Sequence, residues 1–306
     1  MRYRIRHETR YTYVSDVVHA HHLLHLVPRP SAYQQCVNFE LTFTPAADRR
    51  HDVIDAFGNV VTRLELEQPH RQLSVLSELE VDVHRRPPVV AGQTDPWERV
   101  RDDLAYGGSW PARDRLEASK FRHESRHVRI KQMFTDYAAD CFATGQPVLM
   151  CAEALMSKLH GDVEYAPGET SVETPLPDVL RKRSGVCQDF AHLMIACLRS
   201  RGLAARYVSG YLRTNATRAA APGESHGSAL VGTGASHAWV AVYSPPFGWV
   251  ELDPTNDCRA GTDHIAIAWG RDFGDVSPLR GVILGGGSHQ LEVHVKVEPL
   301  AGPAIP

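Results

Sequence analysis

The sequence predicts a two-domain α+β fold: an N-terminal antiparallel β-sandwich-like domain, then a domain of helices followed by strands. Two changes in pattern support this prediction. Residues 1–85 alternate apolar and polar side chains, which is typical of strands that bury one face. From about residue 126 the apolar positions recur every three or four residues, as in helices. We therefore divide the chain into a β domain with its connector (1–118) and a core (119–306).

Turn signals separate the alternating segments of the first domain. The alternation runs through residues 3–7, 37–43 and 78–83, and the turns carry Pro-Arg-Pro and Phe-Gly-Asn. Proline and glycine favour turns because one fixes φ and the other tolerates positive φ. Strands at this spacing favour an antiparallel sandwich. Between residues 85 and 122 the pattern becomes irregular, and we expect the connector there.

The core is expected to contain helices first and strands afterwards. Thr174 can cap a helix whose first turn holds Pro175, and Gly202 ends a later helix. A stretch rich in Ala, Gly, Ser and Thr at 214–235 is typical of a mobile loop. Helices are expected at 126–142, 147–160, 174–183 and 186–201, and strands at 206–212, 237–243, 249–253 and 291–298.

Composition and charge limit the classes of function. A formal net charge of -3 gives no overall electrostatic reason to bind nucleic acid or an acidic membrane. No run of about 18 apolar residues is present, so no spanning helix is expected. The first residues lack the apolar stretch of a secretory signal. The six cysteines lack zinc-type spacing, so we expect reduced thiols in the cytoplasm and no metal or other cofactor.

The helix expected at 186–201 carries a candidate nucleophile in its first turn. Cys187 would lie beside backbone N–H groups that have no partner inside the helix, at the positive end of the helix dipole. Such a position favours the reactive thiolate, and Gly185 would leave room for a substrate backbone. However, a cysteine on a buried helix is more often a small apolar side chain, as we expect for Cys197. Cys187 alone is therefore weak support for catalysis.

A predicted hairpin brings a histidine and an aspartate together. Two of the expected core strands flank a Pro-Pro-Phe-Gly turn. If Tyr243 pairs with Trp249, Asp253 becomes the diagonal neighbour of His237 on the same face, with backbones about 7–8 Å apart. A carboxylate and an imidazole can bridge that gap with one hydrogen bond. We therefore predict a His237–Asp253 pair in which the carboxylate fixes the imidazole tautomer and stabilises its cation.

Four stretches of the core resemble the bacterial transglutaminase-like family, whose members are often described as cysteine proteases. Cys, His and Asp follow in the order of that family, the N-terminal strands resemble its β domain, and residues 270–273 resemble its tail. The resemblance implies a papain-like transglutaminase core with Cys187 as nucleophile, His237 as base and Asp253 as the residue that orients the base. The four stretches are 184–192, 204–211, 236–240 and 248–256.

These residues predict thiol-dependent acyl transfer from amide bonds of a peptide or protein substrate, by a cysteine peptidase, an amidase or a transglutaminase. The thiolate would attack the carbonyl, and the backbone N–H of the nucleophile would be the first donor to the oxyanion. Water or an amine would then resolve the thioester, and the loop 214–235 is placed to control access as a lid. Candidates for a second oxyanion donor or for the wall of the cleft are Tyr165, Gln188 and Trp239.

Two other classes of function remain open. One is a non-catalytic protein-binding module on the same fold, although an intact triad argues against it. The other is a metal-dependent enzyme that uses the His-rich segment near the N-terminus, although acidic or Cys partners at ligand spacing are missing. That segment contains His19, His21, His22 and His25. In the core, Asp189 and His192 lie three residues apart and are expected to pair and to hold the catalytic helix.

Overall fold

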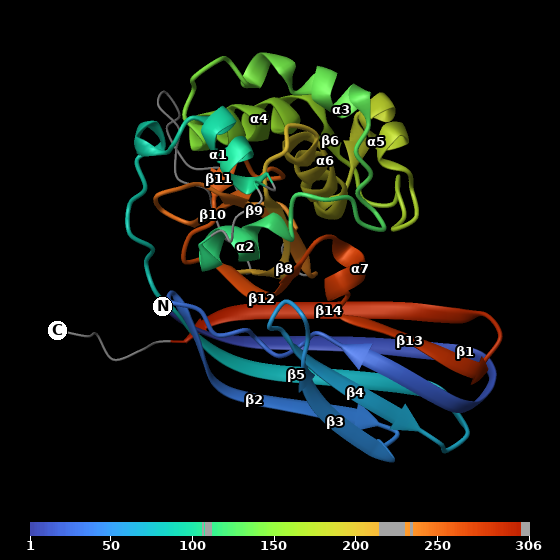
Figure 1. Ribbon diagram of the computed structural model, residues 1–306. Helices are drawn as coiled ribbons and strands as arrows, with labels where there is room; N and C mark the ends of the chain where they lie inside the picture. Colours follow the sequence, from blue (N-terminus) through green and yellow to red (C-terminus); the bar gives the residue numbers. More distant parts are fainter. Residues whose placement is uncertain (106, 108–111, 214–229, 233–234, 301–306) are drawn as a thin grey trace.

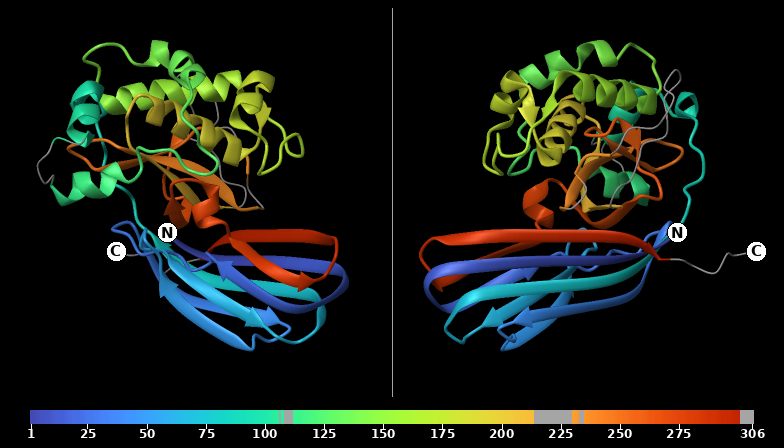
Figure 2. Two further views of the ribbon diagram at one scale, coloured as in Figure 1. Left: turned by 45° about the vertical axis from the view of Figure 1, so that its right-hand side comes forward. Right: turned by 180° about the vertical axis from the view of Figure 1, so that it is seen from behind.

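The computed structural model describes residues 1–105, 107, 112–213, 230–232 and 235–300. It contains a β domain and a core of helices and strands, which lie one above the other in Figure 1. Two further views show the same two layers, with most of the helices on the side of the core away from the β domain and α7 (Phe273–Val276) next to it (Figure 2). The α+β fold class predicted from the sequence is confirmed.

The β domain is one antiparallel sheet whose central strand, β1 (Arg2–Leu24), runs through both of its halves. The order of neighbouring strands in this sheet is β2-β5-β1-β4-β3. Side chains along the strands alternate between buried and exposed, and the buried ones pack together into an apolar cluster. The strands are therefore hydrogen-bonded into one continuous sheet. The other strands in this order are β2 (Gln34–Thr44), β3 (Arg49–Ile54), β4 (Val60–Leu66) and β5 (His70–Val83).

The last two strands of the chain pair with its first strand. Strands β13 (Leu279–Gly285) and β14 (His289–Leu300) both lie antiparallel to β1 (Figure 1). The sequence division had grouped these strands with the core, and the sheet pairing corrects this point. Val295 and Val297 bury their side chains in an apolar cluster with residues of β1 and β5, which favours this pairing over exposure.

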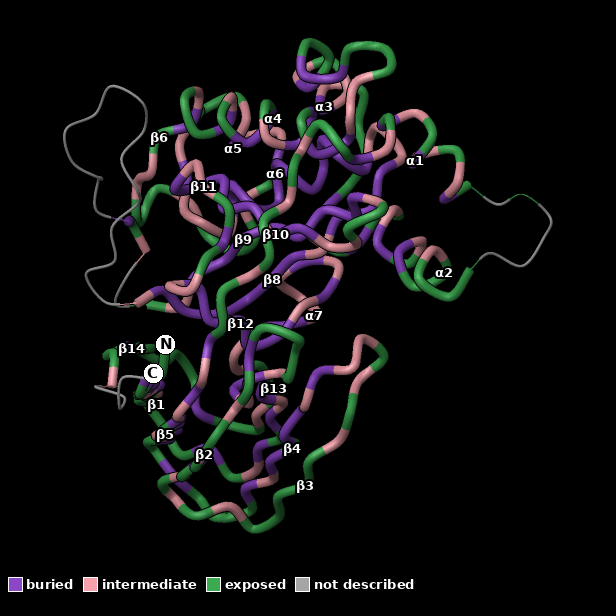
Figure 3. The backbone as a smooth tube through the Cα atoms, turned by 90° about the vertical axis from the view of Figure 1, so that its left-hand side faces the viewer, coloured by how far each residue is buried: buried purple, intermediate pink, exposed green. Residues whose placement is uncertain are grey.

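The second domain, which we call the core, contains a five-stranded sheet covered by helices. Its order is β11-β10-β9-β8-β12, and α6 packs on β8 and β9 (Figure 1). Buried backbone concentrates in this central layer (Figure 3). The strands are β8 (Ala205–Leu212), β9 (His237–Tyr243), β10 (Trp249–Asp253), β11 (Cys258–Arg259) and β12 (His264–Gly270). The helices that cover the sheet include α4 (Val148–Asp162), α5 (Leu176–Lys182) and α6 (Cys187–Ser200).

Two sequence predictions about helices need correction. The expected connector contains α1 (Trp97–Leu104) and α2 (Arg113–Ser119), which its proline and glycine content had concealed. The helix expected at 126–142 is reduced to α3 (Gln132–Tyr137) and a 3₁₀ turn, Ala139–Cys141. The shorter elements are a 3₁₀ turn at Ala91–Gln93, strands β6 (Glu164–Tyr165) and β7 (Ser184–Gly185), and helix α7 (Phe273–Val276).

An apolar cluster and several hydrogen bonds join the β domain to the core. The cluster combines residues of β1 and β5 with residues of β8 and β12. The Tyr3 hydroxyl donates to Asp263 Oδ1 at 3.0 Å, just before β12 begins. His7 Nδ1 lies 2.6 Å from the Tyr211 hydroxyl on β8. The β domain therefore supports the sheet that carries the candidate site. Within the described ranges, no helix has both the length and the apolar character needed to cross a membrane.

Candidate active site

Cys187 is the first residue of α6 and is half-buried. The segment before it is held by Asp189, whose carboxylate accepts from Val186 N at 2.9 Å and from the Thr170 hydroxyl at 2.6 Å. A Cβ atom at Gly185 would lie 2.7 Å from Asp189 Oδ2. The space beside Gly185 therefore holds the capping carboxylate, whereas the sequence had suggested room for a substrate backbone.

The predicted hairpin register is confirmed. Tyr243 pairs with Trp249, and His237 Nε2 lies 2.8 Å from Asp253 Oδ2. Both side chains are fully buried, so water does not compete for this bond. The sequence pattern of the two strands thus places the imidazole and the carboxylate as expected.

Asp253 accepts hydrogen bonds at both of its oxygens. Besides His237, Oδ2 receives Asn256 Nδ2 at 2.7 Å and His264 Nε2 at 3.1 Å. Oδ1 receives the backbone N–H groups of Thr255 at 3.1 Å and Asn256 at 3.3 Å. The carboxylate is therefore fixed from several sides. The sequence argument had assigned no role to His264, because its strand joins the site only through tertiary pairing with β8.

The charges of His237 and Asp253 reinforce each other. Burial alone would lower the pKa of His237, but attraction to Asp253 and then to Cys187 outweighs it and raises the pKa to about 10. Burial alone would raise the pKa of Asp253, but His237 and then His264 hold it well below its usual value. The imidazole is therefore a cation at neutral pH, paired with a carboxylate and close to the thiol of Cys187.

The second ring nitrogen of His237 faces the short segment 230–232. Among the described residues His237 Nδ1 has no partner in good hydrogen-bond geometry, but the Cys187 thiol is near enough to raise the pKa of the ring, and a Cβ atom at Gly232 would lie 2.5 Å from Nδ1. Asn256 holds this segment, because it accepts from Val231 N at 2.8 Å and donates to Val231 O at 3.3 Å. Most of the predicted lid, 214–229 and 233–234, lies outside the described residues.

The three cleft candidates lie in different surroundings. Tyr165 is half-buried and close to Cys187: burial, and then Cys187, raise the pKa of its hydroxyl. Gln188 lines a cavity of about 190 Å³ together with Asp189 and His192. Trp239 is fully buried and donates to Glu251 Oε2 at 2.7 Å, with its ring stacked near His237. Trp239 therefore supports the imidazole from behind and does not form an open wall.

The expected pair of Asp189 and His192 is not formed. Asp189 caps the segment before α6, whereas His192 Nε2 accepts from Phe273 N at 3.1 Å. Both residues still hold α6, but through different partners. Asp189 uses the N–H three residues before it, as in a capping box, whereas His192 uses a distant N–H that its sequence position does not reveal.

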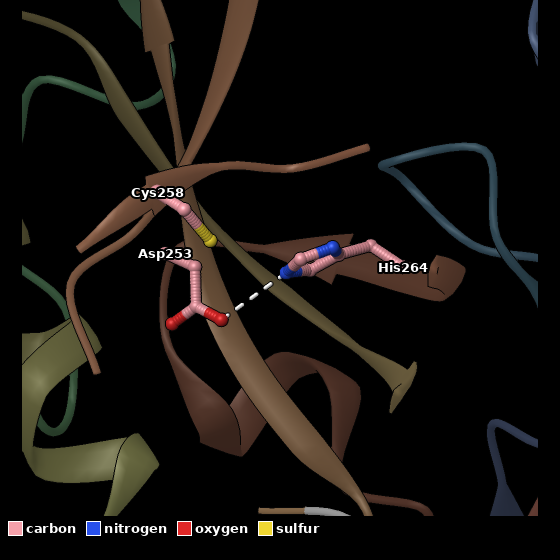
Figure 4. Close-up of side chains that lie close together, drawn as sticks. All are labelled: Asp253, Cys258 and His264. Atoms are coloured by element: carbon pink, nitrogen blue, oxygen red, sulfur yellow. Dashed lines mark hydrogen bonds and ion pairs between the residues drawn. The ribbon is translucent and has the colours of Figure 1, made fainter. Parts of the chain in front are cut away.

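The four histidines of the His-rich segment, in β1 and just after it, do not converge on one point. His19 Nε2 and His21 Nε2 lie 2.7 Å apart on the exposed face, whereas the ring of His22 is buried on the opposite face. His25 is buried and lies beside Ser277 O and Asp55. Among the described residues, one group has three metal-ligating atoms within 4.8 Å of one another: Asp253, Cys258 and His264 (Figure 4).

Comparison with known protein families finds a match for the β domain and a match for the core. Residues 3–82 match the bacterial transglutaminase-like N-terminal region, and residues 135–254 match the transglutaminase-like superfamily. An uncharacterized protein of Mycobacterium tuberculosis is 37% identical, covering 99% of this chain and 95% of its own. A second one, from Mycobacterium leprae, is 33% identical over 98% of this chain and 99% of its own length.

Two further similarities concern the core and the fold. A protein-glutamine gamma-glutamyltransferase of Pseudomonas aeruginosa is 33% identical over 37% of this chain and 16% of its own length. The solved structure of a "putative cysteine protease" from Cytophaga hutchinsonii has a TM-score of 0.73 and 21% identity, covering 100% of this chain and 93% of its own. The fold and the full-length relatives together show that this chain belongs to the bacterial transglutaminase-like superfamily.

Proposed function

We propose that the protein is a cysteine enzyme that transfers acyl groups from amide bonds of peptides or proteins through a thioester. One observation carries the proposal. A half-buried cysteine at the start of a helix lies beside a buried histidine whose far nitrogen is 2.8 Å from an aspartate. Attraction to Asp253 and then to Cys187 outweighs the effect of burial and raises the pKa of His237 to about 10, which suits a group that gives a proton to the leaving amine.

In the first half of the reaction, the sulfur of Cys187 attacks the amide carbon. The charge that develops on the carbonyl oxygen is met by the backbone N–H of Cys187 at the helix N-terminus. His237 then donates its proton to the leaving amine, and Asp253 keeps the ring oriented. Tyr165, close to Cys187, is our candidate for the second donor to the oxyanion.

In the second half, water or a primary amine releases the acyl group. We propose both hydrolysis and transamidation as outcomes, since the three residues act in the same way in each. A glutamine-containing peptide distinguishes them: ammonia release without added amine indicates hydrolysis, and a cross-linked product with added primary amine indicates transfer.

The first prediction concerns the nucleophile. Cys187→Ala is expected to lower the rate of ammonia release by about 10⁴-fold or more, because the covalent step is lost. Cys36→Ala is the matched control, since Cys36 is also half-buried but belongs to β2 in the other domain. Equal rates for wild type and Cys187→Ala would rule out this function and would favour a non-catalytic protein-binding module.

We also propose a cytoplasmic location. The support is the sequence itself: the six cysteines are widely scattered and do not have the spacing of a disulfide framework, so we expect them to be reduced in a reducing compartment. Fractionation of cells that produce the protein tests this proposal, and recovery outside the cytoplasm would contradict it.

A further inference from the structure

Asp253 is contacted by two imidazoles, and the mechanism described above uses only one of them. His264 begins β12 and is 3% exposed in its side chain, while Asp253 is fully buried. The two histidines reach the same carboxylate oxygen from two strands, His237 at 2.8 Å from β9 and His264 at 3.1 Å from β12. The bond between His264 and Asp253 is drawn as the dashed line in Figure 4.

The hydrogen bonds of His264 define which ring nitrogen carries the proton. Its Nδ1 accepts from Gly261 N at 3.3 Å, so Nδ1 is the acceptor and Nε2 is the N–H that donates to Asp253. Cys258 lies close to this pair, as it does in Figure 4. However, a histidine that binds a metal donates a proton from its other nitrogen, and here a backbone N–H already points at that nitrogen. The arrangement therefore suits a hydrogen-bond donor to a carboxylate better than a metal ligand.

Other elements hold His264 in this orientation. Its ring packs edge-on against Trp239, with centroids 5.3 Å apart, and Trp239 also stacks near His237. The preceding residue, Asp263, accepts from Tyr3 of the β domain at 3.0 Å. The start of β12 is thus held by contacts from both domains. Because the His264 side chain is already held in place, it loses little conformational entropy when it donates a hydrogen bond to Asp253.

We propose that His264 is a positioning residue of the acyl-transfer site, which holds the Asp253 carboxylate in the rotation that His237 needs. The proposal rests on the function proposed above. Without His264, the carboxylate keeps His237 and Asn256 at Oδ2 and two backbone N–H groups of the loop after β10 at Oδ1, but among the described residues it loses its hydrogen-bond donor from β12. Misorientation of Asp253 would then change the tautomer and the charge of His237.

The test compares two substitutions of similar length. His264→Gln keeps an N–H donor near the position of Nε2, whereas His264→Met has similar bulk and no donor. The readout is the rate at which iodoacetamide alkylates Cys187, measured by mass spectrometry of the peptide that contains it. Alkylation needs no amide substrate, so it reports on the site even if the proposed function is wrong.

We expect His264→Met to slow alkylation by about tenfold or more, and His264→Gln to recover most of the rate. The acid limb of the pH profile should also move to higher pH in His264→Met. The groups that face Asp253 are His237, His264 and Cys258, and removing the donation from His264 lets the carboxyl protonate earlier. His22→Leu, which removes a buried histidine of the β domain, should leave the rate unchanged.

Two results would overturn the inference about His264. One is a wild-type rate and acid limb in His264→Met, and the other is an equal loss in the Gln and Met variants, which would indicate packing alone. If the Met variant does not fold, ¹⁵N–¹H spectra of the wild type decide, because the proposal requires a protonated Nε2 and a bare Nδ1. Failure of the proposed function is distinguished by Cys187→Ala, which would then leave amide cleavage unchanged whatever the His264 variants do.

Discussion

Two buried histidines, one in each part of the molecule, show opposite behaviour. His22 in β1 is 4% exposed and His237 in β9 is 1% exposed. Burial, with His70 and His21 nearby, lowers the pKa of His22 to about 4, whereas Asp253 and Cys187 raise that of His237 to about 10 against the effect of burial. Both ring nitrogens of His22 lack a hydrogen-bond partner among the described residues. Burial without an ionic partner therefore lowers the pKa of His22, whereas the charges of Asp253 and Cys187 raise the pKa of His237 in spite of burial.

The largest effect is expected when the partner carboxylate is removed. Asp253→Asn should lower the pKa of His237 from about 10, because its strongest attraction is lost. The rate of thiol-dependent amide cleavage should fall by about 10³- to 10⁴-fold, since the ring loses its orientation. NMR titration of the His237 ring protons measures the first effect, and steady-state kinetics the second. An unchanged titration midpoint in Asp253→Asn would show that Asp253 is not the reason why the pKa of His237 is higher than that of His22.

A smaller effect is expected at the second nitrogen of His237. Gly232→Ala should lower alkylation of Cys187 by about tenfold, because the new methyl group would lie 2.5 Å from Nδ1 and must displace the ring. Gly168→Ala is the matched control: Gly168 has φ +90° and Gly232 has φ +87°, but a Cβ atom at Gly168 meets no neighbour within 4 Å. Equal rates in the two variants would mean that backbone strain, and not contact with His237, causes the loss.

Substitution of His22 is expected to have the smallest effect on activity but a clear effect on how stability depends on pH. Its pKa is about 4 in the folded protein and about 6.5 when unfolded, so the unfolded chain binds more protons between these values. Stability should therefore fall as the pH is lowered from about 6.5 to 4, by on the order of 3 kcal/mol from this group. His22→Leu should remove that part of the acid sensitivity in denaturant titrations, and His51→Leu, at an exposed position, should not.

His237 should show the reverse dependence. Its folded pKa of about 10 lies above the unfolded value, so its stabilisation is complete below about pH 6.5 and is lost as the pH rises through about 10. Denaturant titrations of wild type and His237→Gln across this range measure the difference. A wild-type advantage that grows with pH would contradict the assignment of His237 as a cation.

The parts of the site that depend on local sequence were predictable. The pairing of Tyr243 with Trp249 follows from a short turn, and it places Asp253 beside His237 by register alone. His264 could not be placed in this way. Its strand pairs with β8, about 50 residues away, and the register shifts at a bulge between Ala266 and Ala268. Only the tertiary fold determines which side chain then faces Asp253.

The same distinction explains the errors in the fold. Alternation correctly predicted strand residues 291–298, but alternation cannot tell which sheet a strand joins, and β14 joined β1. Helix α1 was missed although Trp97, Val100 and Leu104 are buried at helical spacing, because prolines and glycines nearby suggested irregular structure. In both cases burial against distant residues decided the outcome.

The pairing of β1 with β14 also affects how this protein is made. Arg2 pairs with Leu300, so during synthesis β1 has to wait for β14, which is made about 300 residues later. At ordinary rates of synthesis, the delay is roughly 15–60 s for a chain of this length. Throughout that time the N–H and C=O groups on one edge of β1 have no strand partner, and such edges attract other chains. This edge of β1 is therefore open to other chains until β13 and β14 have been made.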